Sequence, residues 1–375
     1  MKIAIIHDHL TCKGGGEQVA LAFHKAFPDA PIYTLAYNTN ETYPEFRSAD
    51  IRTSWFQILS NKEEIVKKLF FPFGIIASKQ IDVRDFDIIL MSTTHCAKYV
   101  KTNKKSLVIC YAHNPFRLAW YPDEYREYAN AKGVKKYMYN LVIRILKEVD
   151  KNATNKINYM LTNSSTVFQR LRDTYTNYKG EITIIPPPVN LTNFDLSNDS
   201  KDYFLIVSRL ENYKRVDIAI SAFNELGWKL IIVGKGALET ELKKKANSNI
   251  IFKSNLSKEE LRDVYSRAKA FIFPQMEDYG ITPLEANASG LPVIAYGRGG
   301  VLDTQISLQK SGVVSKSTAI FFQDQTANSL VEAVQFFKSK EHEFSPTFIR
   351  QHASKFSELV FIEKIKAFIH QKSPF

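Results

Sequence analysis

The chain has 375 residues and a formal net charge of +11, and 45% of its residues are hydrophobic. That length exceeds what one hydrophobic core usually serves, so we expect two globular domains. No stretch approaches the roughly 18 apolar residues of a membrane-spanning helix. The opening "MKIAIIHDHL" (1–10) has too short an apolar run for a signal peptide. These features argue against an integral membrane protein, and we expect the protein to act in the cytosol.

The basic charge is concentrated between residues 51 and 150, where 17 Lys and Arg face 10 Asp and Glu. Such a surplus suits nucleic acid, an anionic membrane or a phosphorylated ligand, and it equally suits a plain solvated surface. The three cysteines, Cys12, Cys96 and Cys110, show neither paired spacing nor a zinc pattern. Their number agrees with a reducing compartment.

Short apolar runs recur along the chain with helical patterns between them. They are residues 2–6, 87–91, 106–112 and 159–162 in the first half and 203–207, 229–233, 270–273 and 292–296 in the second. Continuous rather than alternating runs indicate strands buried on both faces, as in parallel sheets. Segments 214–226 and 257–268 read as crossover helices, and Ser257 with Glu260 forms a capping box. We therefore predict an α/β fold of two doubly wound domains.

The boundary between the domains is predicted near "IIPPPVNLTNFDLSNDS" (184–200). Three prolines stiffen this segment, and proline is excluded from the interior of a parallel sheet. We place a first Rossmann-like domain at residues 1–188 and a second Rossmann-like domain at 189–354.

A glycine turn and a helix start are predicted in "MEDYGITPLEANASG" (276–290). Gly280 permits a turn, Thr282 suits the N-cap, Pro283 suits the first helical position, and Gly290 would stop the helix. This helix would begin at the carboxyl edge of a parallel strand, where such folds bind ligands. Its free N–H groups and its dipole would attract a phosphate.

The same stretch carries two carboxylates, Glu277 and Glu285. Glu285 could simply close a capping box, and Glu277 could be an exposed loop acid. The functional alternative is that both accept hydrogen bonds from sugar hydroxyls, because carboxylates repel phosphate but bind O–H groups strongly. A ligand that carries both sugars and phosphates, such as a nucleotide sugar, would explain acids beside a phosphate-binding helix start.

Matching cations occur in "SRLENYKRVD" (208–217), where Arg209 and Lys214 follow a predicted strand. Arg can hold phosphate oxygens with two parallel bonds, and Lys adds a point charge. "KGGGEQ" (13–18) lacks the spacing of a dinucleotide fingerprint, yet its glycines let the backbone approach a ligand. Surface solvation and a flexible turn are the plainer explanations of these two features.

Together these stretches resemble a known family. "GGGE", "SRLENYK", "EDYGITPLEANASGLPVIA" and "GRGG" (297–300) resemble the retaining glycosyltransferases of family 4. The resemblance implies the GT-B fold, in which two Rossmann-like domains face a cleft. It implies that the first domain is on the acceptor side, that the second binds the nucleotide sugar, and that 355–375 crosses back to the first domain. "IIHDHLTCKGGGEQV" and "YAHNPFRLAWYP" (111–122) further resemble a branch that builds bacterial surface polysaccharides such as lipopolysaccharide, in which many members transfer mannose.

The resemblance assigns roles to residues of the second domain. Glu277 would lie beside the donor sugar and Glu285 at the ribose, while Arg209 and Lys214 would bind the donor diphosphate. The remaining implied donor contacts are at the helix start, Gly280, Ile281 and Thr282. The family needs no metal or other cofactor. We find no DxD motif that would hold a divalent ion as the donor clamp, and Arg209 and Lys214 offer a reason, because they would replace the metal. Ser208 and Lys253-Ser254 stand where the family often has glycine, and the second departure concerns the pocket for the base.

In the first domain the resemblance places Gly14 and Gly15 against the donor and His113 near the donor sugar. A lone histidine after an apolar strand is also commonly a hydrogen-bonded core residue. Arg117 and Trp120 share the His113 loop and could meet an acceptor sugar or a lipid phosphate, or could equally pack the loop.

The predicted activity is retaining, metal-independent transfer of a hexose from a nucleotide diphosphate sugar to a hydroxyl of a glycan or lipid-linked acceptor. By resemblance GDP-mannose leads, and UDP-glucose, UDP-galactose and UDP-N-acetylhexosamines stay open. One alternative is a nucleotide-sugar epimerase of the same fold. Another is a basic nucleic-acid-binding protein, although the chain has no helix-turn-helix, zinc-finger or RNA-binding aromatic signature.

Two stretches are candidates for peripheral contact with the inner face of the cell membrane. One is "KKLFFPFGIIASK" (67–79), and the other is a basic helix at 134–149. The apolar positions assigned to one face of that helix are Val134, Tyr137, Met138, Leu141, Val142, Ile145 and Val149. A basic amphipathic helix suits an anionic bilayer, and a helix packed on its own sheet shows a similar stripe.

Overall fold

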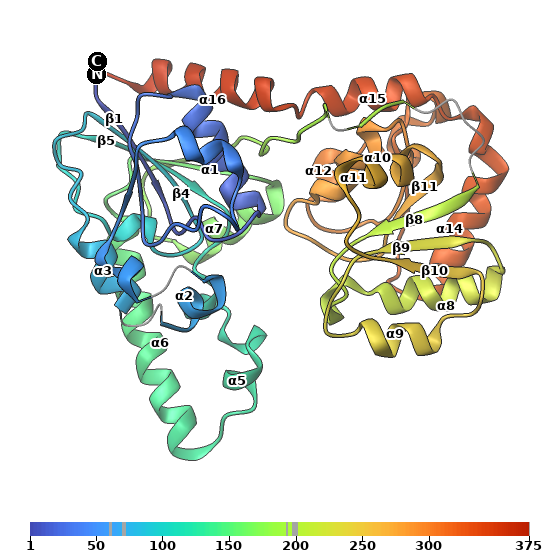
Figure 1. Cartoon of the computed structure of the whole chain (residues 1–375), viewed down its shortest axis with the longest axis horizontal. Coiled ribbons are helices and arrows are strands. Elements are labelled where there is room, and N and C mark those ends of the chain that lie inside the picture. Colours follow the sequence, from blue (N-terminus) through green and yellow to red (C-terminus); the bar gives the residue numbers. More distant parts are fainter. Residues whose placement is uncertain (60–61, 70–72, 193, 197–201, 375) are drawn as a thin grey trace. The chain divides into compact units, whose positions relative to one another are not determined.

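A computed structural model describes residues 1–59, 62–69, 73–192, 194–196 and 202–374. The chain divides into two compact units (Figure 1). The first unit comprises Met1–Pro188 and Glu358–Phe375, and the second comprises Val189–Ser357. The sequence puts the boundary after residue 188 and the start of the returning segment at 355, three residues before Glu358.

The first unit is built on a parallel sheet with the strand order β3-β2-β1-β4-β5-β6-β7 in the described part of the chain. Its strands are β1 (Ile3–His7), β2 (Ile32–Thr34), β3 (Ile51–Thr53), β4 (Ile88–Thr93), β5 (Leu107–Ala112), β6 (Tyr159–Thr162) and β7 (Glu181–Ile184). From β1 the chain builds outward to one edge through β2 and β3, and then returns to build the other edge from β4. The order therefore reverses between β1 and β4.

The second unit repeats this plan, with a parallel sheet in the order β10-β9-β8-β11-β12-β13 among its described residues. Its strands are β8 (Tyr203–Val207), β9 (Leu230–Val233), β10 (Ile250–Lys253), β11 (Ala268–Phe273), β12 (Val293–Tyr296) and β13 (Ala319–Phe322). Here the order reverses between β8 and β11. The predicted fold class, two doubly wound α/β domains, is confirmed.

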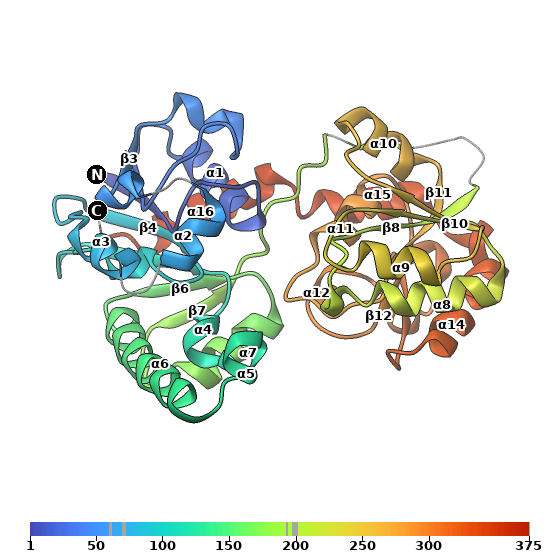
Figure 2. The same cartoon turned by 60° about the horizontal axis from the view of Figure 1, so that its bottom comes forward.

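Helices cover the sheets and connect the strands (Figure 2). Those of the first unit are α1 (Gly15–Ala26), α2 (Glu63–Leu69), α3 (Ile75–Gln80), α4 (Arg117–Trp120), α5 (Arg126–Ala129), α6 (Gly133–Thr154), α7 (Ser165–Thr174) and α16 (Glu358–Lys372). Those of the second unit are α8 (Val216–Leu226), α9 (Glu239–Lys245), α10 (Lys258–Ser266), α11 (Ile281–Ala288), α12 (Val301–Thr304), α13 (Leu308–Ser311), α14 (Ala327–Lys340) and α15 (Pro346–Ser354). None of the helices that the structure describes is long and apolar enough to cross a bilayer.

Both faces of the first sheet are buried, which explains its continuous apolar runs. On β1, Ile5 joins a cluster with Phe23 of α1 and Phe361 of α16. Its neighbour Ile6 points to the other face, into a cluster with Val167 of α7. Because successive strand residues point to opposite faces, a strand covered on both sides needs an apolar residue at nearly every position.

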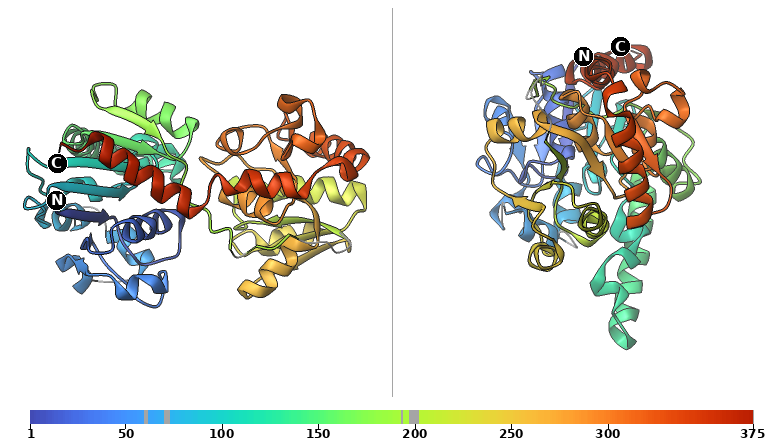
Figure 3. Two further views of the ribbon diagram at one scale, coloured as in Figure 1. Left: turned by 90° about the horizontal axis from the view of Figure 1, so that it is seen from above. Right: turned by 90° about the vertical axis from the view of Figure 1, so that its right-hand side faces the viewer.

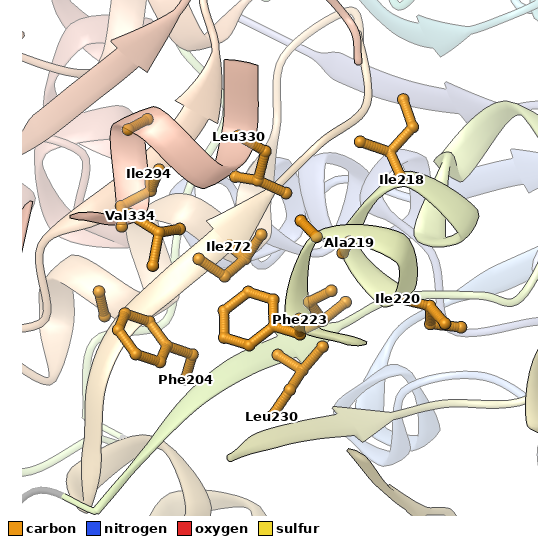
Figure 4. Close-up of a cluster of buried hydrophobic side chains, with 14 of the residues drawn as sticks. Phe204, Ile218, Ala219, Ile220, Phe223, Leu230, Ile272, Ile294, Leu330 and Val334 are labelled. Carbon is orange, nitrogen blue, oxygen red and sulfur yellow. The ribbon is translucent and has the colours of Figure 1, made fainter. Parts of the chain in front are cut away.

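The second sheet follows the same rule. Phe204, Ile272 and Ile294 from three adjacent strands pack against Phe223 of α8 and Leu330 of α14 (Figure 4). The opposite face has its own buried cluster. Each large side chain buried in this way stabilises the fold by about 1.5–3 kcal/mol. The second unit therefore has a core of its own that holds its strand ends in place.

The helix α16 packs within the first unit, as the resemblance implies. Phe361 stacks on Phe23 of α1 with 5.9 Å between ring centroids, and Lys25 pairs with Glu358 at 2.8 Å. Figure 3 shows α16 lying along the first unit near its strands. Residues 358–375 therefore complete a domain whose remainder ends 170 residues earlier in the sequence, at Pro188.

Two local predictions can be compared with the helix ends. The capping box of Ser257 and Glu260 is present at the start of α10. The predicted N-cap at Thr282 is wrong, because α11 begins at Ile281 and Gly280 precedes it with φ +87°. Glycine adopts this left-handed conformation without steric cost, so the turn completes two residues earlier than expected. The predicted stop at Gly290 is confirmed, since α11 ends at Ala288 and Gly290 has φ +74°.

Candidate active site

The first candidate group lies in the second unit, where its strand order reverses. Strands β8 and β11 are neighbours in the sheet although β9 and β10 lie between them in the sequence. The chain leaves β8 into the loop with Arg209 and Lys214, and it leaves β11 into the loop with Glu277. Both loops therefore emerge at the same carboxyl edge. In open α/β sheets this reversal point is where ligands bind.

Lys214 and Glu277 form an ion pair across these two loops. Gln275 Nε2 also donates to Glu277 Oε1, at 2.9 Å. The two paired side chains are partly buried, with 12% and 23% of their surfaces exposed. An ammonium group has three N–H donors, so Lys214 can hold Glu277 and still donate to a ligand. The pair joins the two loops that sequence alone could only place separately.

Arg209 and Lys214 contact the same tyrosine. Arg209 Nη2 donates to the hydroxyl of Tyr213 at 2.6 Å, and Lys214 Nζ lies 5.0 Å from the centre of the Tyr213 ring. Arg209 is itself exposed. Tyr213 thus organises two cations at the edge of the sheet, and two adjacent cations are a suitable site for a diphosphate.

Two glycines after β9 allow the Arg209 loop to be packed from behind. A Cβ at Gly234, which has φ +154°, would lie 1.8 Å from the carbonyl oxygen of Ser208. A Cβ at Gly236 would lie 2.3 Å from the carbonyl oxygen of Leu210. No other residue fits this close backbone approach. The sequence analysis did not single out "GKG" (234–236), although glycines directly after an apolar run were the available signal.

The loop at 297–300 supports Glu277. The N–H of Gly300 donates to the carbonyl oxygen of Glu277 at 2.9 Å. A Cβ at Gly299, where φ is +79°, would lie 2.4 Å from that oxygen. The "GRGG" stretch that contributed to the family resemblance therefore has a physical purpose, since its backbone fixes the Glu277 loop.

The start of α11 follows Glu277 directly. Gly280 is buried and turns the chain so that Ile281 and Thr282 form the first turn. The N–H groups of a first helical turn have no partner within the helix, and together with the helix dipole they favour an anion. The three predicted donor contacts thus lie at a helix start in the same loop as the Lys214–Glu277 pair.

Glu285 lies one turn further along α11. The hydroxyl of Tyr265 donates to Glu285 Oε2 at 3.0 Å, so Glu285 caps no helix. Burial raises the pKa of this carboxyl, and the Tyr265 hydrogen bond opposes the rise only in part. Residues four apart share a helix face, so Glu285 lies on the same face as Ile281.

The second candidate group lies in the first unit, at the carboxyl ends of β1, β4 and β5. His113 follows β5, and its ring Nε2 lies 2.9 Å from the Oγ of Ser92 in β4. Burial and the nearby charge of His7 lower the pKa of His113 to about 4. The imidazole is therefore neutral at physiological pH. This group also lies where the strand order reverses, next to the β1–β4 pair.

The glycine turn of the first unit abuts these histidines. Gly14 precedes α1 and Gly15 begins it. A Cβ at Gly16 would lie 3.4 Å from His7 Cε1 and 3.6 Å from His113 Nε2. The Oγ of Ser92 also lies 3.3 Å from the carbonyl oxygen of Gly16. The predicted approach of Gly14 and Gly15 to a donor stays a prediction, while the structure places their neighbour Gly16 against His113.

Glu17, the acid of "GGGE", is turned toward His7. Its Oε1 lies 3.7 Å from His7 Nε2 and accepts from the Sγ of Cys12 at 3.2 Å. Burial alone would raise the pKa of Glu17, but the hydrogen bond and charge of His7 outweigh it and lower the pKa to about 2. Burial alone would lower the pKa of His7, and Glu17 instead raises it. The two residues therefore form a buried charged pair that the sequence analysis did not identify.

Asp8 anchors the loop that follows β4. Its carboxylate accepts from the Thr93 hydroxyl at 2.6 Å and from the N–H groups of Thr94 at 2.7 Å and Ala97 at 2.8 Å. Burial would raise the pKa of Asp8, but His95 and these donors hold the pKa well below its usual value. Asp8 is thus a structural anion at the edge of the sheet.

Two groups of side chains have the donor types of a metal site. Among the described residues, the potential ligand atoms lie within 4.8 Å of one another in each of the groups Asp8, His95, Cys96 and His9, Cys12, Glu17. In the first group the carboxylate already accepts several backbone and hydroxyl donors. In the second, Glu17 is paired with His7. The metal independence implied by the resemblance remains a prediction.

The two acceptor-side candidates differ in their surroundings. Trp120 Nε1 donates to Asp150 Oδ2 of α6 at 2.8 Å, so this indole joins α4 to α6. Arg117 is about half exposed and lies 3.8 Å from Glu124. Packing of the loop, the alternative kept open for both residues, thus accounts for Trp120, and an acceptor contact stays a prediction for each.

Residues 191–353 match the family model described as Glycosyl transferases group 1. The matched range covers most of the second unit. It contains Arg209, Lys214, Glu277 and Glu285, so the family match and the candidate group fall in the same unit.

Curated relatives extend the likeness beyond that domain. Alpha-1,3/1,6-mannosyltransferase ALG2 of Kluyveromyces lactis is 23% identical, over 83% of this chain and 72% of that protein. The O-antigen chain mannosyltransferase RfbU of Salmonella typhimurium is 29% identical, over 38% of this chain and 43% of that protein. The resemblance to mannose-transferring glycosyltransferases stated from the sequence is thereby confirmed.

Solved structures confirm the GT-B fold. Anabaena Alr3699/HepE, determined in complex with UDP, aligns with a TM-score of 0.70 at 14% identity, over 99% of this chain and all of that one. At this identity the likeness shows the fold, so the glycosyltransferase fold extends across both units.

Proposed function

We propose that the protein transfers a hexose, with mannose from GDP-mannose as the leading donor, to a hydroxyl of a glycan or lipid-linked acceptor in polysaccharide biosynthesis. The observation that carries the proposal is the pair of cations on Tyr213 beside Glu277, at the reversal point of a glycosyltransferase sheet. The names of the mannosyltransferase relatives support mannose. The UDP complex of a structural relative supports a nucleotide donor in general.

The cations would act on the leaving group. When the bond between sugar and diphosphate breaks, negative charge builds on the phosphate oxygens, and fixed positive charge there lowers the barrier. Arg209, Lys214 and the N–H groups at the start of α11 would supply that charge in place of a metal ion. Attack on the same face, assisted by the leaving phosphate, is our preferred route to retention.

The Lys214–Glu277 pair suggests how the free site is held before the donor binds. Without a ligand, each charge neutralises the other in a partly buried place. A diphosphate would take part of the Lys214 interaction, and Glu277 could then accept hydrogen bonds from sugar hydroxyls. Glu285 would accept from the ribose, and the neutral ring of His113 would hydrogen-bond the sugar without adding charge.

A panel of nucleotide sugars tests the donor. Purified protein is heated with each candidate, because a ligand at 100 times its Kd stabilises the fold by about 2.7 kcal/mol. The donor with the largest shift is then incubated with acceptor, and the product is analysed by mass spectrometry and by NMR of the anomeric proton. We expect GDP-mannose and a retained anomer. A shift with UDP-sugars alone would replace the donor, and an inverted product would overturn retention.

The Arg209→Ala variant tests the diphosphate clamp, because unchanged turnover would remove Arg209 from the mechanism. The alternatives leave different traces. An epimerase would convert the sugar with no acceptor present. A nucleic-acid-binding protein would bind random DNA with strong salt dependence and would show no shift with any nucleotide sugar.

We further propose that α6 contacts an anionic membrane surface. The large exposed apolar residues of this helix lie between its start and its middle, and they are Val134 (77%), Tyr137 (71%), Met138 (62%), Leu141 (50%) and Ile145 (47%). Their spacing places them on one helix face, and α6 extends away from the sheet of the first unit (Figure 1). The sequence analysis put Val142 and Val149 on the same face, but both pack against the buried cluster around Leu146. The two patterns overlap in sequence because the helix is buried at one end and exposed at the other.

Charge supports a membrane as the occupant of this face. Lys135, Arg144 and Lys151 are exposed on the same helix, and the exposed Lys132 directly precedes it. Basic residues beside an apolar face attract anionic lipid. In the other predicted stretch, 67–79, residues 70–72 lie outside the described residues. Its exposed apolar side chains Phe73 and Ile76 are secondary candidates.

Co-sedimentation with vesicles of phosphatidylglycerol and phosphatidylcholine tests this contact. We expect binding that falls with salt and that is lost when Val134, Tyr137 and Met138 are changed together to serine. The matched control is Ile251→Ser, which removes an exposed apolar residue of the second unit. No binding at low salt, or equal binding of the triple variant, would overturn the membrane proposal and leave the transferase proposal unchanged.

A further inference from the structure

Ser92 lies between two histidines in the first unit. Its Oγ is 2.9 Å from His113 Nε2 and 3.2 Å from His7 Nδ1. His7 Nδ1 is also 3.0 Å from the backbone carbonyl oxygen of Ser92. The three residues come from the ends of three neighbouring strands, so the sheet itself sets these distances.

The proton on His7 Nδ1 follows from its partner. A carbonyl oxygen can only accept a hydrogen bond, so His7 Nδ1 must carry a proton and donate it to Ser92 O. On the other side of the ring, His7 Nε2 faces the carboxylate of Glu17 at 3.7 Å. A carboxylate favours a proton on the facing nitrogen, so His7 is held as a doubly protonated, charged ring.

The N–H of His7 limits where the hydroxyl proton of Ser92 can point. Because His7 Nδ1 presents an N–H to this corner, a lone pair of Ser92 Oγ faces it and the hydroxyl proton must point elsewhere. Two acceptors remain, His113 Nε2 at 2.9 Å and the carbonyl oxygen of Gly16 at 3.3 Å. The shorter contact is the stronger hydrogen bond. On that ground we take His113 Nε2 as the acceptor, which puts the single proton of the neutral ring on Nδ1. In the opposite arrangement, Nε2–H would donate to Ser92 Oγ and the hydroxyl would donate to Gly16 O, and the NMR experiment distinguishes the two.

We propose that Glu17, His7 and Ser92 are positioning residues that hold His113 in the Nδ1–H tautomer, so that this N–H donates to an oxygen of the bound sugar. The role of the sugar rests on the proposed function, whereas the tautomer rests on the hydrogen bonds alone. A fixed tautomer matters because the other one would present an acceptor to the ligand and would bind different hydroxyl orientations.

The glycine turn fits this assignment. Gly16 packs against both histidine rings, with its hypothetical Cβ 3.4 Å from His7 and 3.6 Å from His113. A Cβ at Gly14 would lie 2.6 Å from Glu17 Oε2, so a larger residue there would move the Glu17 carboxylate. The glycines of "GGGE" therefore help to fix a relay, by which we mean the chain of contacts from Glu17 through His7 and Ser92 to His113.

Nitrogen-15 NMR of histidine-labelled full-length protein measures the tautomer directly. Long-range proton–nitrogen spectra distinguish a protonated ring nitrogen from an unprotonated one, and the His113 signals are assigned by their loss in His113→Asn. We expect an unprotonated Nε2 in the wild type. In Ser92→Ala the ring should shift toward Nε2–H, and in Glu17→Gln the His7 ring should lose its second proton at a lower pH than in the wild type.

Ser106→Ala is the matched control, since Ser106 is a buried serine at the other end of β5 whose hydroxyl donates to Phe86 O at 2.7 Å. It should leave the tautomer unchanged. With an active donor and acceptor, Ser92→Ala should lower turnover about tenfold, the effect of one lost hydrogen bond, and Ser106→Ala should not. A wild-type His113 with its proton on Nε2, or a tautomer unaffected by Ser92→Ala, would overturn the proposal. Absence of transferase activity would contradict the proposed function and leave the NMR result standing.

Discussion

The two reversal points, one in each sheet, have the same topology and opposite chemistry. In the second unit the charged groups at this edge are partly or fully exposed, and two cations meet at Tyr213. In the first unit the charged groups are buried and paired among themselves, as in Glu17 with His7 and Asp8 with the loop after β4. An open charged site is suited to a charged ligand, whereas a closed one presents neutral hydrogen-bonding groups such as His113.

The comparison shows that fold and residue choice answer different questions. A doubly wound sheet determines where loops from distant parts of the sequence meet. The residues in those loops determine what can bind there. Placement of charge, rather than strand order, distinguishes a diphosphate clamp from a group suited to an uncharged sugar.

The largest effect, a loss of stability, is expected when a buried and paired charge of the first unit is removed. Asp150 is fully buried, pairs with Lys98 at 2.5 Å and accepts from Trp120 and Tyr175. Asp150→Ala should lower the free energy of unfolding of this unit by about 3–5 kcal/mol, because it leaves a buried lysine unpaired. Hydrogen exchange monitored separately in each unit measures the loss.

The matched control for Asp150→Ala is Glu239→Ala, which breaks the surface pair with Lys243 in α9. Exposed pairs of this kind contribute about 0–1 kcal/mol. Equal stability losses for the two variants would contradict the view that the first unit is the one whose charges are structural.

The second prediction concerns the open charges of the second unit. Lys214→Ala should lower kcat/KM by about 10²–10³, as for loss of one group that stabilises a charged transition state. Steady-state rates with the donor chosen above provide the measurement. Lys243→Ala is the control, since Lys243 is a surface lysine of the same unit, and its rate should match the wild type. Wild-type rates for Lys214→Ala would mean that this edge does not clamp the leaving group.

The third prediction compares the units by pH. The pKa values of His9 and His113 are lowered to about 4, chiefly by burial, so both rings fold neutral but take up protons in the unfolded chain below pH 6.5. Stability of the first unit should therefore fall as pH drops from about 6.5 toward 4, by roughly 3 kcal/mol at most for each ring. The lowered pKa values of Asp8 and Glu17 also reduce the stability of this unit as pH falls, at more acidic pH than the two histidines. His7 has the opposite effect, because its pKa is raised.

In the second unit the partly buried carboxyl of Glu285 has a raised pKa. The stability that this carboxyl contributes is fully present below its unfolded pKa and is lost as pH rises through its folded pKa. The second unit therefore gains stability from Glu285 as pH falls. Hydrogen exchange at pH 7 and pH 5 should show the first unit losing protection relative to the second. Equal losses would contradict the pH comparison.

Much of the fold could be predicted because buried strands of parallel sheets have a clear signal. Each of the eight apolar runs lies in a strand, from Ile3–His7 to Val293–Tyr296. The strands outside those runs are β2, β3, β7, β10 and β13, and four of these five are sheet edges in the described structure. The edge strand Glu181–Ile184 is exposed at both ends and has no continuous apolar run. The edge strands Ile250–Lys253 and Ala319–Phe322 do carry short apolar runs, which the sequence analysis did not single out.

The site could be predicted only in part. Arg209, Lys214 and Glu277 were found by residue type and resemblance, and the structure brings them to one edge. The relay through Glu17 and Ser92 depends on β1 and β4 being neighbours, and no local pattern states the order of strands. His7 directly follows the first apolar run, and Glu17 directly follows the glycines. Both residues can be read from the sequence, but their proximity in space cannot.

The smallest effect is expected at Glu285. Its Glu285→Gln variant distinguishes a role in donor binding from a role in stability. Glu285→Gln keeps the shape and can still accept from Tyr265, but it loses the charge that would bind ribose hydroxyls. We expect the donor KM to rise about tenfold, the value of roughly one charge-assisted hydrogen bond. Thermal stability should stay equal or rise, since the raised pKa of Glu285 shows that its charged form is costly in the fold. Tyr265→Phe is the complementary control, because it removes the internal hydrogen bond that Glu285→Gln keeps and retains the carboxylate that Glu285→Gln removes. If Glu285→Gln lowers stability and leaves KM unchanged, Glu285 serves the packing of α11. The donor site of the second unit would then include Lys214 and Glu277 but not Glu285.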